Sequence, residues 1–291
     1  MIRVRTALIS CTLLLSLMAL SAHSSSAQVA ARPAPTPTPP DLHARVDETV
    51  VDPSIPDDKA VDKMLEVYAP KVRALDIKIG NLKGELRKGG IGSGSLGNFV
   101  TDGLREEASR KLGKPVVLAV TNGGGLRKSV IAEGELRERD IFELLPFENA
   151  LVAFDLTGAQ VLDLLRVAVT HRDAQSGARI KYRTGNDQTP EIETVRLLID
   201  GQQKEIDPAA IYTVVSIDYL MNRRSTTPSA TEGDYSILRA AKNIKPIGLT
   251  MRDAMIDYVK SETAAGREIR PTLDGRFVFD KSRSETPEQP Q

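Results

Sequence analysis

Hydrophobic residues recur with regular spacing over one long stretch of the chain. Apolar positions three or four residues apart predict helices over 61–75, 95–112 and 158–169, and one beginning at Thr250. Nearly continuous apolar runs predict buried strands at 116–121 and 150–156, and further strands fit 180–183, 194–199, 212–217 and 275–279. Because helices and strands alternate, we expect an α/β fold, α+β-like in detail, with mixed sheets.

Capping and turn residues indicate where these elements end. Asp57 or Asp58 is placed to cap the first helix, and Pro70 should kink that helix without ending it, because the apolar stripe continues. Thr157 and Gln160 form a capping-box pattern, and Thr250 and Asp253 are predicted to open the last helix. Gly113 should end the second helix, and Asp200-Gly201 predicts a tight turn.

The N-terminal pattern is typical of a secretory signal peptide, predicted at 1–27. Arg3 and Arg5 precede an apolar run, and small polar residues follow it. The run is short for a bilayer core of about 30 Å, although an uncleaved anchor is the alternative. Cys11 lies inside the run, which disfavours a lipoprotein signal. We expect export to the periplasm or outside the cell, with no membrane span after cleavage.

The remaining chain divides by composition. Residues 28–56 form a Pro-rich linker, with five prolines between Arg32 and Asp41, which favours an extended polyproline II spacer. Residues 57–280 are predicted to fold as one domain. Residues 281–291 are polar without periodicity and are predicted to form a flexible tail.

Charge and aromatic content limit the possible functions. The 39 basic and 39 acidic residues balance, which argues against a nucleic-acid partner. Six Phe, six Tyr and no Trp leave few candidates for stacking on a ligand. The mixed-charge clusters 105–111 and 137–140 are typical of solvated helix faces.

Three loops carry candidate chemistry. Asn122, three glycines and Arg127 follow a predicted strand, so the backbone there can take positive φ and approach a ligand, although a plain turn has the same pattern. Phe147 follows Pro146 after a short helical turn capped by Asp140 and Glu143, and a core phenylalanine is the alternative. The third candidate is Asp218-Tyr219 with the polar loop that ends at Glu232–Tyr235, which could equally be ordinary surface.

Taken together and in this order, these motifs resemble the C-terminal domain of 5′-nucleotidases. The resemblance also includes Ser95-Leu96-Gly97-Asn98-Phe99 and Leu156-Thr157-Gly158, and it extends from about Val61 to Phe279. It implies a single domain with stacked mixed sheets and helices on the outer faces. It also implies that the domain binds the nucleoside part of a nucleotide.

The resemblance assigns roles to individual residues. Asn122 would contact the base, Arg127 the ribose or phosphate, and Asp234 the ribose hydroxyls. Phe147 would stack on one face of the base, and Tyr219 on the other. The predicted substrate-binding set is completed by Gly123, Gly124, Gly125 and Asn149.

Two departures from the family pattern concern the same pocket. Gly90, Ile91 and Gly92 stand where the family has an arginine, and Arg87 or Lys88 could substitute for it. The acidic motif is shortened to Glu232–Tyr235 and follows a longer loop.

Residues for hydrolysis are missing from the sequence. Complete family members hold two metal ions on a separate N-terminal metallophosphatase domain, and this chain has three histidines and no His-rich ligand motif. His171 with Asp173 is interpreted as a loop pair. We therefore predict no catalytic residue and no cofactor in this chain, and divalent metals only on a separate metallophosphatase partner.

Three functions are consistent with these patterns. The first is an exported nucleotide-binding chain that takes part in nucleotide hydrolysis with that partner. The second is a non-catalytic nucleoside-binding module. The third is a structural protein with a decayed pocket.

Overall fold

The computed structural model describes residues 48, 50–185, 188–222 and 235–280. The predicted signal peptide, most of the predicted linker, the tail and Asp234 lie outside these ranges. Contacts group residues 57–291 into one compact unit and residues 1–56 into another. Among the described residues, no helix combines the length and the apolar character that a membrane crossing requires.

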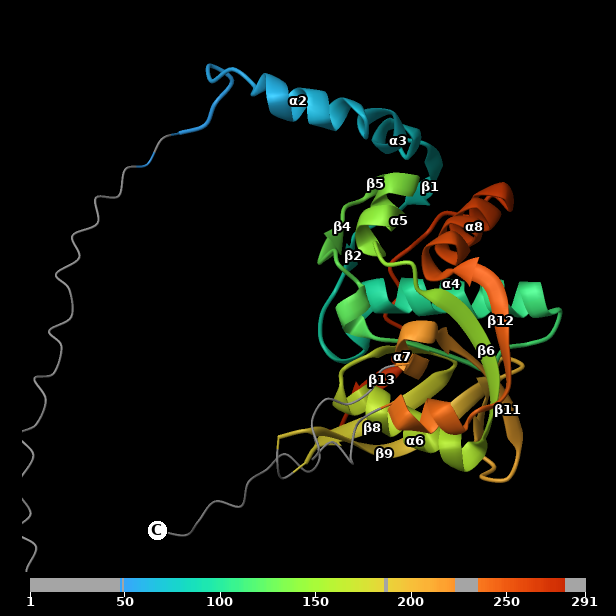
Figure 1. The fold of residues 1–291 in the computed structure, drawn as a ribbon. Coiled ribbons are helices and arrows are strands. Elements are labelled where there is room, and N and C mark those ends of the chain that lie inside the picture. The colour runs from blue at the N-terminus through green and yellow to red at the C-terminus, as the bar shows by residue number, and fades with distance from the viewer. Residues whose placement is uncertain (1–47, 49, 186–187, 223–234, 281–291) are drawn as a thin grey trace, which may run out of the picture. The chain divides into compact units, whose positions relative to one another are not determined.

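Helices and strands alternate along the compact unit (Figure 1). The helices are α2 (Lys59–Glu66), α3 (Ala69–Ala74), α4 (Gly94–Leu112), α5 (Glu138–Leu144), α6 (Gly158–Thr170), α7 (Asp218–Asn222) and α8 (Met251–Ala264). Short 3-10 turns are η1 (Ile91–Ser93), η2 (Gly123–Gly125) and η3 (Tyr235–Ala240).

The described strands form four sheets. The 5-stranded sheet has the order β12 (Lys242–Thr250), β6 (Ala150–Thr157), β11 (Ile211–Ile217), β3 (Leu118–Thr121) and β7 (Ala174–Ser176). The 4-stranded sheet has the order β10 (Gln202–Glu205), β9 (Pro190–Ile199), β8 (Ala178–Thr184) and β13 (Phe277–Phe279). Two small sheets pair β1 (Lys78–Leu82) with β5 (Gly134–Arg137), and β2 (Leu86–Arg87) with β4 (Val130–Ile131).

The predicted class, α/β with mixed sheets, is confirmed. β11 is parallel to β3, whereas β6 and β7 pair antiparallel with their neighbours. α6 contacts β6 of the larger sheet and β9 of the smaller one, so this helix lies between the two sheets. α4 packs on β3 and β7, and α8 packs against α4 (Figure 1).

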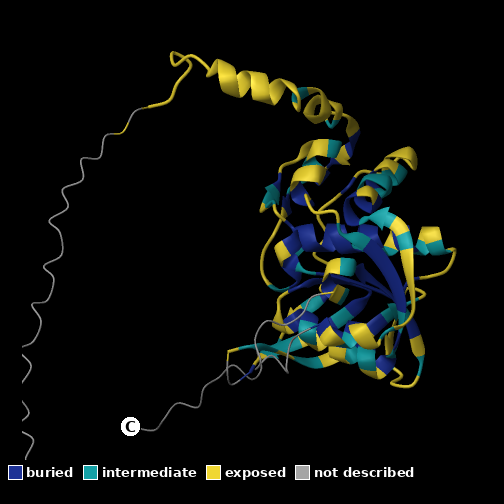
Figure 2. Ribbon diagram, in the orientation of Figure 1, coloured by how far each residue is buried: buried dark blue, intermediate teal, exposed yellow. Residues whose placement is uncertain are grey.

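The core centres on α4 and the 5-stranded sheet. Residues 95–101 are buried without interruption, so the first half of α4 is enclosed on all sides (Figure 2). The cluster 105–111 is only partly the solvated face that its charges predict, since Glu107 is 1% exposed and pairs with Arg110. Burial raises the pKa of the Glu107 carboxyl, and the charge of Arg110 opposes that shift.

The first predicted helix is two helices. α2 ends at Glu66, and Pro70 lies in the first turn of α3, where its missing N–H costs no helical hydrogen bond. Asp58 caps α2 by accepting a hydrogen bond from the Ala60 N–H at 2.7 Å. The large apolar residues of both helices, including Met64 and Val72, are exposed.

Other predicted helix ends are confirmed. α6 begins with reciprocal Thr157 and Gln160 hydrogen bonds, and α8 begins with the same arrangement of Thr250 and Asp253. Gly113 ends α4 with a φ of 64°.

At the start of α5, Asp140 accepts a hydrogen bond from the Arg137 N–H at 2.8 Å, as a capping residue does. The predicted capping role of Glu143 is wrong, because this residue lies in the last turn of α5 and pairs with Lys128.

Candidate functional site

The predicted motifs meet at one edge of the 5-stranded sheet. β11 runs parallel to β3, so the loops after Ile217 and after Thr121 leave the sheet at the same edge. β6 is antiparallel to β11 and pairs Leu151 with Ile217, so the Pro-Phe loop enters the sheet at that edge. Strand pairing between segments distant in sequence therefore assembles the candidate site.

The glycine loop packs closely against the start of α4. A Cβ at Gly123 would lie 2.5 Å from Ser93 Oγ, so a side chain at this position would require Ser93 to move. Among the described glycines with positive φ, none belongs to the triple-glycine run. The loop therefore uses the small size of glycine and not the positive φ that the sequence allows.

Asn122 offers an unused acceptor in this loop. Its Oδ1 atom is buried and has no hydrogen-bond partner among the described residues. Leaving a buried acceptor unpaired costs about 1–3 kcal/mol. An N–H group of a ligand, such as a nucleobase carries, would remove that cost.

Asp173 holds the glycine loop through a hydrogen bond to its backbone. It is 5% exposed and precedes β7, whose residue Ala174 pairs with Thr121 at the same edge. Its Oδ1 accepts a hydrogen bond from the Gly123 N–H at 2.7 Å, and its Oδ2 accepts one from the Tyr235 hydroxyl at 2.6 Å. The Tyr235 ring is buried and stacks on His171 with centroids 6.1 Å apart.

Replacing Tyr235 with phenylalanine should destabilise the fold by about 1–2 kcal/mol, because the buried Asp173 carboxylate loses a hydroxyl donor. Urea unfolding measures this change. Tyr182→Phe is the matched control, since no hydrogen bond of its hydroxyl is found within the described ranges, and its expected effect is near zero. Equal stability of the two variants would contradict the proposed support of the loop.

Of the two residues that could substitute for the missing arginine, Lys88 is the one that lines a cavity beside the glycine loop. Its Nζ donates to the Leu126 carbonyl at 2.8 Å. It lines a cavity of about 260 Å³ together with Gly124 and Asp173. Burial lowers the pKa of the Lys88 ammonium, the positive charge of Arg127 lowers it further, and Asp173 opposes both. Arg87, the other candidate, pairs with Glu85 instead.

The Pro-Phe loop lies beside the glycine loop. Phe147 is 48% exposed, so the alternative of a core phenylalanine is wrong. The Arg127 guanidinium carbon lies 5.9 Å from the Phe147 ring centroid, and the Arg127 N–H donates to the Leu144 carbonyl at 2.9 Å. Asn122 and Phe147 therefore stand on the same side of the molecule.

Arg252 at the start of α8 fixes the Pro-Phe loop, and no sequence motif indicates it. Its Nη2 donates to Glu148 Oε1 at 2.7 Å, and its Nη1 lies 3.4 Å from the Pro146 carbonyl oxygen. The guanidinium also covers the Phe142 ring at 4.1 Å. Arg252 is buried, so it holds the loop backbone while Phe147 stays exposed.

The remaining predicted residues differ in their placement. Tyr219 is 48% exposed on α7 at the same edge of the sheet. Asn149 is half-buried, and its carbonyl accepts from the Met251 N–H at 2.8 Å. Asp234 lies outside the described residues, next to the anchored Tyr235.

The described side chains do not fit a divalent metal pair. Within the described ranges, no three His, Cys, Asp or Glu side chains cluster as a metal site requires. His171 and Asp173, the pair that the sequence places in a loop, support the glycine loop through Tyr235 and Gly123.

Known proteins share this architecture. A family model described as 5′-nucleotidase, C-terminal domain, matches residues 77–231, more than half of the chain. The 5′-nucleotidase of Vibrio vulnificus is 29% identical over 171 residues, covering 57% of this chain and 30% of that protein. Cell wall protein Lmo0130 of Listeria monocytogenes is 28% identical over 201 residues, covering 65% of this chain and 24% of that protein.

A solved structure agrees with these matches. The 5′-nucleotidase precursor from Thermus thermophilus superposes with a TM-score of 0.64 at 25% identity, covering 78% of this chain and 44% of that one. This chain thus spans less than half the length of each of these three proteins. The match over more than half of the chain, together with the shared fold, shows that the chain belongs to the 5′-nucleotidase C-terminal domain family.

Proposed function

We propose that this chain binds the nucleoside part of a nucleotide at the edge of the 5-stranded sheet. The observation that carries the proposal is the half-exposed Phe147 ring, which lies beside Arg127 of the glycine loop. The same glycine loop holds the unpaired Asn122 Oδ1. An exposed ring offers a base a stacking face, and the amide offers its edge an acceptor. Tyr219 is proposed to stack on the second face of the base.

The charges around the glycine loop suit the polar half of a nucleotide. Arg127 and Lys88 bring two positive charges to one loop, which favours a phosphate or the ribose oxygens. Asp234 is proposed to bind ribose hydroxyls, since its neighbour Tyr235 is fixed beneath the loop by Asp173. Gly123, Gly124 and Gly125 would let the ligand approach the backbone, and Asn149 would complete the site.

We further propose that the chain is exported and takes part in nucleotide hydrolysis with a separate metallophosphatase chain. The relatives named 5′-nucleotidase support a part in nucleotide hydrolysis, for which the separate chain is proposed to supply the metals. The name of the cell wall relative and the N-terminal pattern of basic and apolar residues support export.

Two measurements test this function. Calorimetry with adenosine and AMP should show saturable binding to the purified full chain. With AMP and added Mn²⁺ or Zn²⁺, the chain alone should release no phosphate, and release should appear when an exported metallophosphatase encoded beside it is added. Robust hydrolysis by the isolated chain would overturn the division of labour.

The other outcomes identify the alternatives. Nucleoside binding without any activity in the presence of that metallophosphatase would identify a binding module. Absence of adenosine and AMP binding at millimolar concentration would identify a structural protein with a decayed pocket.

A further inference from the structure

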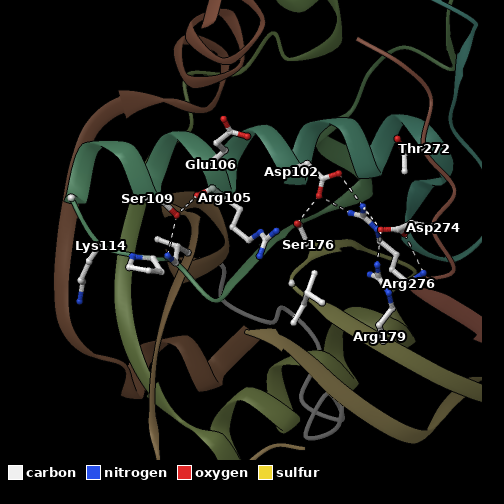
Figure 3. Close-up of a pocket in the computed structure, with 15 residues that line it drawn as sticks. Asp102, Arg105, Glu106, Ser109, Lys114, Ser176, Arg179, Thr272, Asp274 and Arg276 are labelled. Atoms are coloured by element: carbon white, nitrogen blue, oxygen red, sulfur yellow. Dashed lines mark hydrogen bonds and ion pairs between the residues drawn. The ribbon is translucent and has the colours of Figure 1, made fainter. Parts of the chain in front are cut away.

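A second and larger cavity lies under the C-terminal half of α4. Its volume is about 710 Å³, within the range of small-molecule sites. The helix forms one wall, and β7, β8 and the segment before β13 form the others (Figure 3). None of its lining residues lines the cavity beside the glycine loop, although Asp173 and Ser176 lie near opposite ends of β7.

Positive side chains outnumber negative ones in this cavity. The lining includes four basic residues, Arg105, Lys114, Arg179 and Arg276, and three acidic residues, Asp102, Glu106 and Asp274.

The acidic residues are already paired. The Arg276 guanidinium donates to Asp102 at 3.0 and 2.9 Å and to Asp274 at 2.9 and 3.1 Å. Arg179 also pairs with Asp274, at 2.9 Å. Glu106 accepts a hydrogen bond from Arg110 at 3.1 Å, outside the cavity.

These pairings leave Arg105 and Lys114, and Lys114 Nζ donates to Thr213 Oγ1 at 2.9 Å. Within the part of the chain that the structure describes, no carboxylate lies at salt-bridge distance from the Arg105 guanidinium. The side chain is partly buried and extends from α4 into the cavity toward Ser176 (Figure 3). Burial lowers the pKa of Arg105, Asp102 opposes this, and the charges of Arg276 and Arg179 add to it.

A guanidinium stays charged at any physiological pH, so Arg105 remains a cation close to two others. Partial burial of an unpaired charge beside like charges is unfavourable, and an anion between them would relieve the repulsion. The fork of N–H donors on Arg105 and Arg179 matches the oxygens of a phosphate or a carboxylate. Pro115, Val116 and Leu198 supply apolar wall for the rest of such a molecule.

We propose that this cavity is a second binding site, for a small organic phosphate or carboxylate whose anionic group contacts Arg105 and Arg179. The apolar wall contacts the body of the ligand, so an organic anion binds more tightly than inorganic phosphate. This site is separate from the proposed nucleoside site, and neither requires the other.

Backbone amide NMR titration of the full chain tests the site, with phenyl phosphate, benzoate and inorganic phosphate at constant ionic strength. The expected result is saturable shifts at Val116, Gly177 and Arg179 with one or both organic anions, and weaker binding of inorganic phosphate. The two organic probes separate a phosphate site from a carboxylate site. Shifts confined to residues 122–127 would overturn the proposal. So would the absence of saturation by every probe at concentrations up to about 10 mM, which corresponds to a binding free energy weaker than about 3 kcal/mol.

Arg105→Gln should weaken the organic anion at least tenfold, or about 1.4 kcal/mol. Lys111→Gln removes the same charge from the exposed side of α4 outside the lining, and it should leave the affinity unchanged. The midpoint of thermal unfolding of Arg105→Gln should be equal or higher, because an unpaired charge is gone. Equal affinities of the two variants, or marked destabilisation by Arg105→Gln, would overturn the role of Arg105.

Discussion

Replacing Phe147 with alanine should weaken adenosine binding by roughly 10- to 100-fold. Stacking on an aromatic ring contributes about 1–3 kcal/mol per base, and 1.4 kcal/mol corresponds to a factor of ten. The ring is 48% exposed, so its removal leaves little new cavity and the free energy of unfolding should hardly change. Calorimetry measures the dissociation constant, and urea unfolding measures the stability.

Phe279→Ala is the matched control for this experiment. Phe279 is 36% exposed and lies on β13 of the smaller sheet, where its ring contacts Tyr182 at a centroid distance of 5.5 Å. Its loss should leave adenosine affinity unchanged. Equal affinities for the Phe147 and Phe279 variants would remove the stacking role of the Pro-Phe loop.

Replacing Gly97 with alanine should destabilise the fold by about 2–3 kcal/mol. A Cβ at this position would lie 2.0 Å from the Gly92 carbonyl oxygen and 2.8 Å from Ser93 Cβ, so the backbone of η1 has to move. The better helix propensity of alanine, about 1 kcal/mol, offsets only part of this cost. The expected fall in the melting temperature is roughly 4–12 °C.

The same substitution should also weaken nucleoside binding, because η1 carries the Ser93 side chain that lies against Gly123. Gly89→Ala is the control for stability, since a Cβ there meets no atom within 4 Å and the position is exposed. A melting temperature of Gly97→Ala within about two degrees of that control would contradict the steric argument.

Local patterns predicted those elements whose stability is itself local. The capping pairs at Thr157 and Thr250, the stop at Gly113 and the long apolar runs of β6 and β11 agree with the structure. Each depends on side chains within a few residues of one another, so periodicity and capping chemistry are sufficient.

Strands without a local signal escaped prediction. β5 and β10 are largely polar and exposed, and β12 contains Pro246 and pairs with β6 through irregular register. Such strands form because a partner distant in sequence supplies their hydrogen bonds. The prediction that Pro70 only kinks one continuous helix was wrong for a related reason. The apolar residues around Pro70 are exposed, and no described element packs on them to hold a single helix together.

For the candidate site, the amino-acid sequence by itself determined the motif residues, Asn122 and Phe147 foremost, because their types and order resemble a family. Only the tertiary structure decided that Lys88 and not Arg87 faces the pocket, that Asp173 holds the glycine loop, and that Arg252 holds the Pro-Phe loop. The physical reason is that pairing of β3, β6, β7, β11 and β12 in one sheet brings the loops at their ends together at one edge. No local pattern encodes contacts between residues so far apart in the sequence.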